Sequence, residues 1–107
     1  MLHLTSQSRI QLALAPVDFR KQIDGLVALC HNELKQQPRD GSLFVFINRS
    51  KTMIKVLYYD ENGYWLAVKR LSRGRFQSWP NRQEQLTSIR AHELQKILQG
   101  LLASKDK

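Results

Sequence analysis

The sequence has one cysteine, few acidic residues and no long hydrophobic run. Cys30 is alone in the 107 residues, so the chain has no disulfide framework and no CxxC pair, and we expect its thiol to be a small core residue. No apolar run approaches the length of a membrane-spanning helix. Residues 1–15 lack the charged and apolar segments of a secretory signal. We therefore expect a cytoplasmic protein without a membrane partner.

Motifs for catalysis and cofactor binding are missing as well. Neither glycine-rich phosphate-binding motif occurs, and nor does the nucleophile elbow of hydrolases. Asp18 and Asp24 are six residues apart, which places them on different faces of a helix, and Asp60 and Glu61 fall in a predicted turn. A metal-dependent nuclease gathers several acidic residues around a divalent cation, and no third acid joins either pair. We expect no enzyme, no catalytic residue, no cofactor and no metal site.

What the sequence has in excess is positive charge. Its 17 lysines and arginines outnumber 9 acidic residues, for a formal net charge of +8. Most of the excess falls between residues 49 and 82, where eight basic residues accompany two acidic ones. This balance favours a polyanionic partner: nucleic acid, an acidic protein or an anionic membrane. The length and the ordinary apolar content predict one domain, residues 1–107, with an ordered core of about residues 10–101.

Apolar periodicity predicts both strands and helices. Alternating or β-branched runs indicate strands at residues 10–15, 43–48, 53–59, 64–70 and 85–89. Helical spacing indicates a helix over residues 19–36, with Asp18 as its N-cap, and a second over residues 90–99, with Gly100 as its C-cap. The predicted fold class is α+β: a small antiparallel β-sheet with one long N-terminal helix packed on a face and a short C-terminal helix.

The strands at residues 53–59 and 64–70 form a predicted hairpin, because Asn62-Gly63 is a strong turn signal. The register stays open. In a longer loop with Gly63 in the left-handed conformation, Lys55 faces Lys69. In a tighter two-residue turn, Lys55 is opposite Arg70. These lysines interrupt apolar strands, either as a charged binding face or as a defence against strand aggregation.

The segment 69–75, KRLSRGR, is the sharpest local signal. Four cationic side chains within seven residues suit phosphate contacts, because glycine lets the backbone approach and arginine can engage two oxygens. Phe76 and Trp79, with Tyr59 or Trp65 as further candidates, lie close enough in sequence to offer stacking partners for bases. The alternative is a solvated loop whose aromatic residues are buried. The candidate nucleic-acid-binding residues are Arg49, Lys51, Lys55, Lys69, Arg70, Arg73 and Arg75.

Five blocks of the chain follow a known order of motifs. Residues 17–26 read VDFRKQIDGL, residues 41–49 read GSLFVFINR and residues 55–63 read KVLYYDENG. Residues 69–80 contain KRL, GRF and WP, and residues 94–100 read LQKILQG. Together they resemble the TnpB-type accessory proteins that are encoded by the second open reading frame of the bacterial insertion-sequence family numbered sixty-six. The chain departs from the family's pattern at Arg90, where a serine or threonine helix cap is expected. The sequence therefore does not fix the residue at which the last helix begins.

The resemblance covers about residues 10–101 and implies a non-catalytic accessory protein for transposition. Such a protein works beside a larger transposase, which supplies the acidic catalytic residues. On our leading hypothesis the seven basic residues bind DNA, largely independently of its sequence, or contact the transposase–DNA assembly. The alternative is an adaptor that docks on the transposase without binding DNA directly. The sequence leaves the oligomeric state open.

Overall fold

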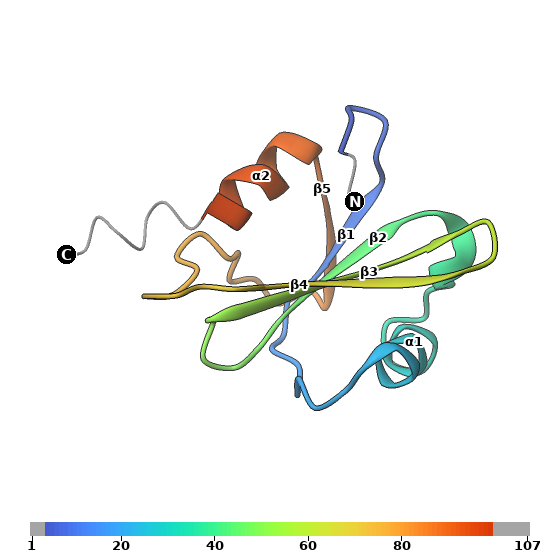
Figure 1. Cartoon of the computed structure of the whole chain (residues 1–107), viewed down its shortest axis with the longest axis horizontal. Coiled ribbons are helices and arrows are strands. Elements are labelled where there is room, and N and C mark those ends of the chain that lie inside the picture. Colours follow the sequence, from blue (N-terminus) through green and yellow to red (C-terminus); the bar gives the residue numbers. More distant parts are fainter. Residues whose placement is uncertain (1–3, 100–107) are drawn as a thin grey trace.

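The computed structural model describes residues 4–99, which build one five-stranded sheet with helices on both sides (Figure 1). The strand order in the sheet is β4-β3-β2-β1-β5. The elements along the chain are β1 (Ile10–Ala13), α1 (Ile23–Asn32), a 3-10 turn η1 (Pro38–Asp40), β2 (Leu43–Ile47), β3 (Met53–Asp60), β4 (Gly63–Arg70), β5 (Leu86–Ile89) and α2 (Ala91–Gln99).

The sheet is mixed, so the predicted antiparallel sheet is wrong. β1 and β2 run parallel, with Ile10 opposite Leu43 and Leu12 opposite Val45, whereas the other pairs of neighbouring strands are antiparallel. A parallel pair requires a crossover connection, and here residues 14–42, which include α1, supply it. Apolar alternation indicates that a strand exists but carries no information on the direction of its neighbour. The broader assignment to α+β agrees with the observed elements.

The first helix is short, which corrects the predicted long helix over residues 19–36. α1 has ten residues, and Gln22 precedes it without a side-chain cap. Asp18, the predicted N-cap, lies in a separate turn and accepts a hydrogen bond from the Arg20 backbone N–H (3.0 Å). Lys35 has a positive φ of 57°, which is incompatible with continuation of the helix. The apolar spacing thus extended beyond the residues that are helical.

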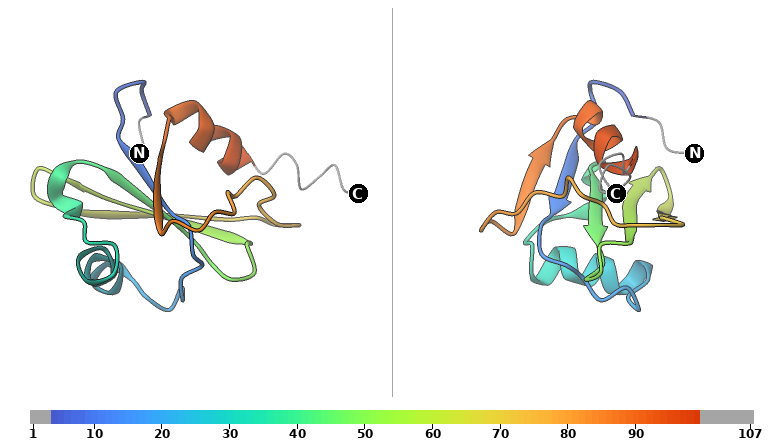
Figure 2. Two further views of the ribbon diagram at one scale, coloured as in Figure 1. Left: turned by 180° about the vertical axis from the view of Figure 1, so that it is seen from behind. Right: turned by 90° about the vertical axis from the view of Figure 1, so that its left-hand side faces the viewer.

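The two helices cover opposite faces of the sheet (Figure 2). On one face Phe44, Phe46 and Leu57 pack with Leu26 and Cys30 of α1. Cys30 is fully buried, as expected for a core residue, and burial raises the pKa of its thiol to about 12. On the other face the alternate strand residues pack with α2 and with the segment after β4; the buried residues of this cluster include Ile10, Leu12, Val45, Ile54, Val56, Phe76, Trp79, Leu94 and Ile97.

The β3–β4 hairpin has a two-residue turn formed by Glu61 and Asn62. Asp60 pairs with Gly63, which puts Lys55 opposite Val68 rather than opposite another cation. Both registers left open by the sequence are therefore wrong. Positive φ values among the described residues occur at four positions, and Gly63 is not one of them. The turn lies one residue earlier than the Asn-Gly signal indicates.

The C-terminal helix begins at Ala91. The Glu93 carboxylate accepts a hydrogen bond from the Arg90 backbone N–H (2.7 Å). The Glu93 N–H, the donor that a serine or threonine cap was expected to serve, donates to the Arg90 carbonyl instead (3.0 Å). The predicted C-cap, Gly100, lies outside the described residues. Within residues 4–99, neither helix has the length and apolar character needed to cross a membrane.

A candidate nucleic-acid interface at the basic end of the sheet

The β2–β3 turn is built by the side chain of Asn48. Its Oδ1 accepts hydrogen bonds from the backbone N–H groups of Thr52 (2.9 Å) and Met53 (3.0 Å). Lys51 takes a left-handed conformation with φ of 62°, and its N–H donates to the Asn48 carbonyl (3.1 Å). Asn48 thereby satisfies the turn internally, and Arg49 projects from it as an exposed side chain.

The segment after β4 lies against this turn. The Leu71 N–H donates to the Thr52 carbonyl (3.0 Å), and the Phe76 N–H donates to the Lys51 carbonyl (2.8 Å). Between these two bonds, Gly74 adopts a positive φ of 72°, which reverses the chain at low steric cost. The loop is therefore tied to the β2–β3 turn at both ends. Its arginines, Arg73 and Arg75, are exposed, as is Arg70 at the end of β4.

The aromatic residues after this loop anchor it to the core. Phe76 is 1% exposed and Trp79 is 7% exposed, and the Trp79 indole N–H donates to the Leu14 carbonyl (3.1 Å). Neither ring can stack on a base, so the stacking interpretation of these two residues is wrong and the buried alternative is confirmed. Of the large apolar side chains, Trp65 is exposed, but it lies near the hairpin tip, where its indole N–H donates to Asp60 (2.7 Å).

Lys55 is buried beneath the segment that precedes α1. Its side chain reaches from β3 to donate hydrogen bonds to the carbonyls of Phe19 (3.0 Å) and Lys21 (2.8 Å), and its Nζ is 4.9 Å from the centre of the Phe19 ring. The residue is 3% exposed, and burial lowers the pKa of its ammonium group. A side chain held in this way fixes the turn at residues 18–21, so we remove Lys55 from the candidate phosphate-binding set.

Lys69 is exposed and interacts with the other helix. Its Nζ donates to the Leu98 carbonyl in the last turn of α2 (2.6 Å). The final carbonyls of a helix lack partners within the helix, and the helix dipole favours a cation there. This lysine therefore joins β4 to α2, and it stays exposed to solvent directly before the basic loop in the sequence.

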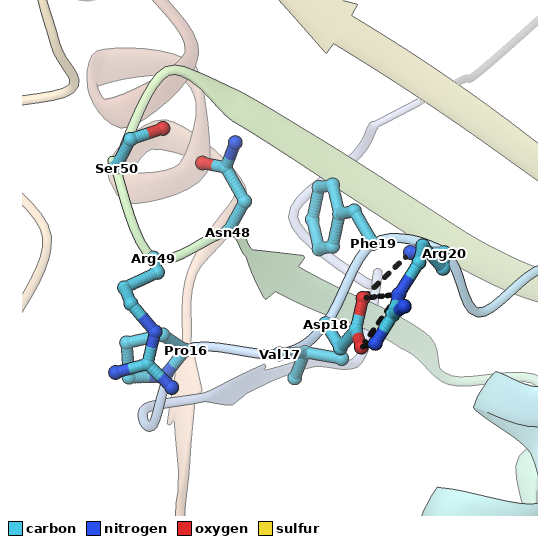
Figure 3. A pocket seen from close by; sticks show the side chains of 8 residues that line it. All are labelled: Pro16, Val17, Asp18, Phe19, Arg20, Asn48, Arg49 and Ser50. Carbon is cyan, nitrogen blue, oxygen red and sulfur yellow. Dashed lines mark hydrogen bonds and ion pairs between the residues drawn. The ribbon is translucent and has the colours of Figure 1, made fainter.

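A hollow of about 650 Å³ separates residues 16–20 from residues 48–50 (Figure 3). The two segments are linked where the Val17 N–H donates to the Ile47 carbonyl (2.9 Å). Arg49 lies on one side of the hollow and the Asp18–Arg20 pair on the other. The hollow brings together residues from the first two blocks that resemble the accessory family.

Arg20 is a basic residue of this region that sequence reasoning missed. Its guanidinium donates to the Asp18 carboxylate through Nη2 (2.6 Å) and Nε (3.0 Å). These hydrogen bonds hold the pKa of Asp18 well below its ordinary value and raise the pKa of Arg20. The position of Arg20 inside the DFRK motif was the signal that could have identified it.

The structure thus gathers most of the predicted basic residues at one end of the sheet. We call this region the basic end and define it as Arg20, Arg49, Lys51, Arg70, Arg73 and Arg75. Across residues 4–99, no three histidine, cysteine, aspartate or glutamate side chains are grouped so that they could hold a metal ion. Exposed guanidinium groups on internally bonded turns can bind the oxygens of phosphate groups.

Comparisons with known proteins identify one family by its model and two uncharacterized relatives. A family model described as "IS66 Orf2 like protein" matches residues 8–107. The uncharacterized protein y4hO of Sinorhizobium fredii (strain NBRC 101917 / NGR234) is 36% identical over 101 residues, which cover 94% of this chain and 87% of that protein. The uncharacterized protein y4jC of the same organism is 40% identical over 68 residues, which cover 64% of this chain and 58% of that protein. No solved structure matches the chain. The chain therefore belongs to the IS66 Orf2-like family, the accessory proteins of insertion-sequence transposition.

Proposed function

We propose that this protein is a non-catalytic DNA-binding subunit of the transposition complex, which contacts phosphate groups through the basic end. The observation that supports this proposal most is the tie between its two loops, formed where Phe76 donates to the Lys51 carbonyl. This bond holds cations from separate parts of the chain on one surface. Lys69 lies beside that surface and adds to its charge. The proposed protein partner is the transposase of the same element, which supplies the catalytic acids.

Binding of this kind reads the DNA backbone rather than the bases. Phe76 and Trp79 are buried, so the loop offers no stacking platform, and its cations suit phosphate oxygens. We expect weak dependence on DNA sequence and strong dependence on salt. The logarithm of the affinity should fall with the logarithm of salt concentration by about 0.9 for each phosphate neutralised.

A double charge reversal tests the proposal. Arg73→Glu/Arg75→Glu should weaken DNA binding at least about tenfold at about 50 mM salt and reduce the salt slope by about two units, because two phosphate contacts are lost. The matched control is Lys35→Glu/Arg39→Glu, which changes the net charge equally at exposed residues away from the basic end. Fluorescence anisotropy with element-end DNA and random DNA measures both effects. Equal affinity of the two variants, or no binding by the parent protein, would contradict the proposal.

The alternative function is an adaptor that docks on the transposase without binding DNA directly. It is favoured by Trp65 and Val68, which are 54% and 52% exposed and offer apolar surface to a protein partner. A pull-down with the transposase, with and without nuclease treatment, distinguishes the two. Nuclease-resistant association by a chain that does not bind DNA would establish the adaptor, whereas association lost on nuclease treatment supports DNA binding.

A further inference from the structure

The outer side of β4 is a long open edge of the sheet. β4 is the terminal strand, and all eight of its residues pair with β3 on one side only. The opposite terminal strand, β5, has four residues. Proteins usually shorten, bend or cover such edges, because their free backbone N–H and C=O groups accept another strand. The register of β4 is continuous from Gly63 to Arg70 and contains no proline.

The register determines which backbone groups face outward. Hydrogen-bonded and non-bonded pairs alternate in an antiparallel ladder, and the Leu71 N–H donates to the Thr52 carbonyl. The odd-numbered residues of β4 therefore bond to β3. The backbone groups of the even-numbered residues face the open side; these residues are Tyr64, Leu66, Val68 and Arg70.

Apolar side chains lie along this edge on both faces of the sheet. Val68 and Leu66 share one face and line a hollow of about 630 Å³ with residues 22–25 at the start of α1. Trp65 lies on the other face, with its ring stacked on Tyr58 at 6.3 Å between centroids. Trp65 and Val68 are the large apolar residues that are most exposed within the described part of the chain. A strand added to this edge would cover them.

Charges of opposite sign occupy the two ends of β4. Asp60 and Glu61 are exposed at the hairpin tip, and Lys69 and Arg70 are exposed at the other end. A strand with the same order of charges that runs antiparallel to β4 places acid beside base at both ends. A parallel copy would instead place like charges together. The strand that matches this pattern is β4 of a second copy, because antiparallel self-pairing is symmetric.

We propose that this chain forms a homodimer by antiparallel pairing of β4 with β4 of a second copy, with the two-fold axis at Ala67. Leu66 then lies opposite Val68 of the second copy, and Tyr64 lies opposite Arg70. All four outward-facing residues thereby exchange backbone hydrogen bonds. A register centred on Leu66 pairs fewer of them, because Arg70 then meets the turn rather than the strand.

The same register brings oppositely charged loops together beyond the strand. The hairpin tip of one copy, which carries Glu61, approaches the basic loop of the second copy, which carries Arg73, and symmetry repeats this approach. Trp65 lies opposite Lys69, whose ammonium can approach the indole face. The two sheets become one continuous sheet, and the two basic ends lie at opposite ends of the paired β4 strands. The dimer goes beyond the proposed function and does not depend on it, since the paired edge forms without DNA.

The mass of the nuclease-treated 107-residue chain in solution tests this proposal. Sedimentation equilibrium from about 1 to 100 μM should show a monomer–dimer equilibrium. Val68→Lys places a charge opposite an apolar residue twice in the dimer, and we expect it to weaken association at least about tenfold. The control, Ser88→Lys, adds the same charge to an exposed position of β5, the other terminal strand, and should leave the dimer unchanged. Circular dichroism verifies that both variants fold.

A charge exchange tests the register itself. Glu61→Arg and Arg73→Glu should each weaken the dimer about fivefold, because each removes two symmetric attractions between opposite charges. The combined variant should return to within about twofold of the parent, because both attractions form again with reversed sign. DNA affinity measured in parallel distinguishes dimer formation from DNA binding. The combined variant should regain the dimer but not the DNA affinity, because it still lacks Arg73.

Two results would overturn a homodimer paired through β4. A mass that stays monomeric at about 100 μM rules it out, as does a dimer that Val68→Lys leaves unchanged. A combined charge-exchange variant that is weaker than either single variant rules out the register. A monomeric chain that loses its association with the transposase on Val68→Lys assigns the β4 edge to the transposase instead.

Discussion

β3 and β4 are neighbouring strands of equal length, yet they have opposite environments. β3 lies between β2 and β4, and its central residues are buried, whereas β4 has one neighbour and no fully buried residue. Each strand carries a lysine among apolar residues. Lys55 of β3 binds two backbone carbonyls inside the protein, and Lys69 of β4 binds one carbonyl at the surface. Position in the sheet, rather than residue type, decides whether a strand cation is structural or available to a partner.

The largest expected effect concerns two leucines that face each other across these strands. Leu57 is fully buried on β3, and Leu66, its partner on β4, is half-buried. Leu57→Ala should lower the free energy of unfolding by about 3 kcal/mol, because it opens a cavity against α1. Leu66→Ala should cost about 1 kcal/mol, because solvent already reaches the site. Denaturant unfolding measures both free energies. Equal losses would contradict the expectation that burial of Leu57 makes it the more important of the two leucines for stability.

The two lysines give the next largest effect. Lys55→Met keeps the length of the side chain but leaves the Phe19 and Lys21 carbonyls without their donor, which should cost about 2 kcal/mol. Lys69→Met removes one exposed hydrogen bond and should cost at most about 0.5 kcal/mol. Thermal or urea unfolding of this matched pair checks the difference. A larger loss of stability for Lys69→Met would show that the bond from Lys69 to α2 stabilises the fold more than the two bonds of Lys55 do.

The smallest expected effect is a shift in the pKa of Asp18. The Asp18–Arg20 pair holds the pKa of Asp18 below its ordinary 3.8, so its contribution to stability is complete above pH 3.8 and is lost as pH falls through the lower, folded-state pKa. Lys55→Met loosens the turn at residues 18–21 and should raise the pKa of Asp18 toward 3.8. Lys69→Met should leave it unchanged. Carboxyl NMR titration resolves the shift, and an Asp18 midpoint that is the same in both variants would show that Lys55 does not position the pair.

The strands were predictable because their signals are local. Each predicted strand lies within one or two residues of an observed one, since alternation of apolar residues and the flanking turn residues act over short distances. The parallel pairing of β1 with β2 was not predictable, because it depends on how residues 14–42 cross the sheet. The early end of α1 was missed for a related reason. Residues 19–22 and 33–36 share its apolar spacing but are held by turns instead.

The sequence predicted which loops form the candidate site, but it did not predict every residue of the site. The charge between residues 49 and 82 drew attention to two loops that backbone hydrogen bonds hold together, and their binding to phosphate stays a prediction. Lys55 was included wrongly, because a lysine inside an apolar strand looks the same in sequence whether carbonyls or solvent receive its ammonium group. Arg20 was omitted because it is distant in sequence from residues 48–50 and lines the same hollow only because the fold brings the two segments together.

The position of β1 has a consequence for synthesis of the protein. β1 is made early, but its two neighbours in the sheet, β2 and β5, are made later, and Gln11 accepts its hydrogen bond from Ser88. On the ribosome, the meander of β2, β3 and β4 can form as soon as it emerges, because its pairings are local. β1 must wait for β5 before both of its sides are covered. Until then one backbone edge of β1 stays open to chaperones and to strands of other chains, and its Ile10 and Leu12 side chains wait for α2 to cover their face of the sheet.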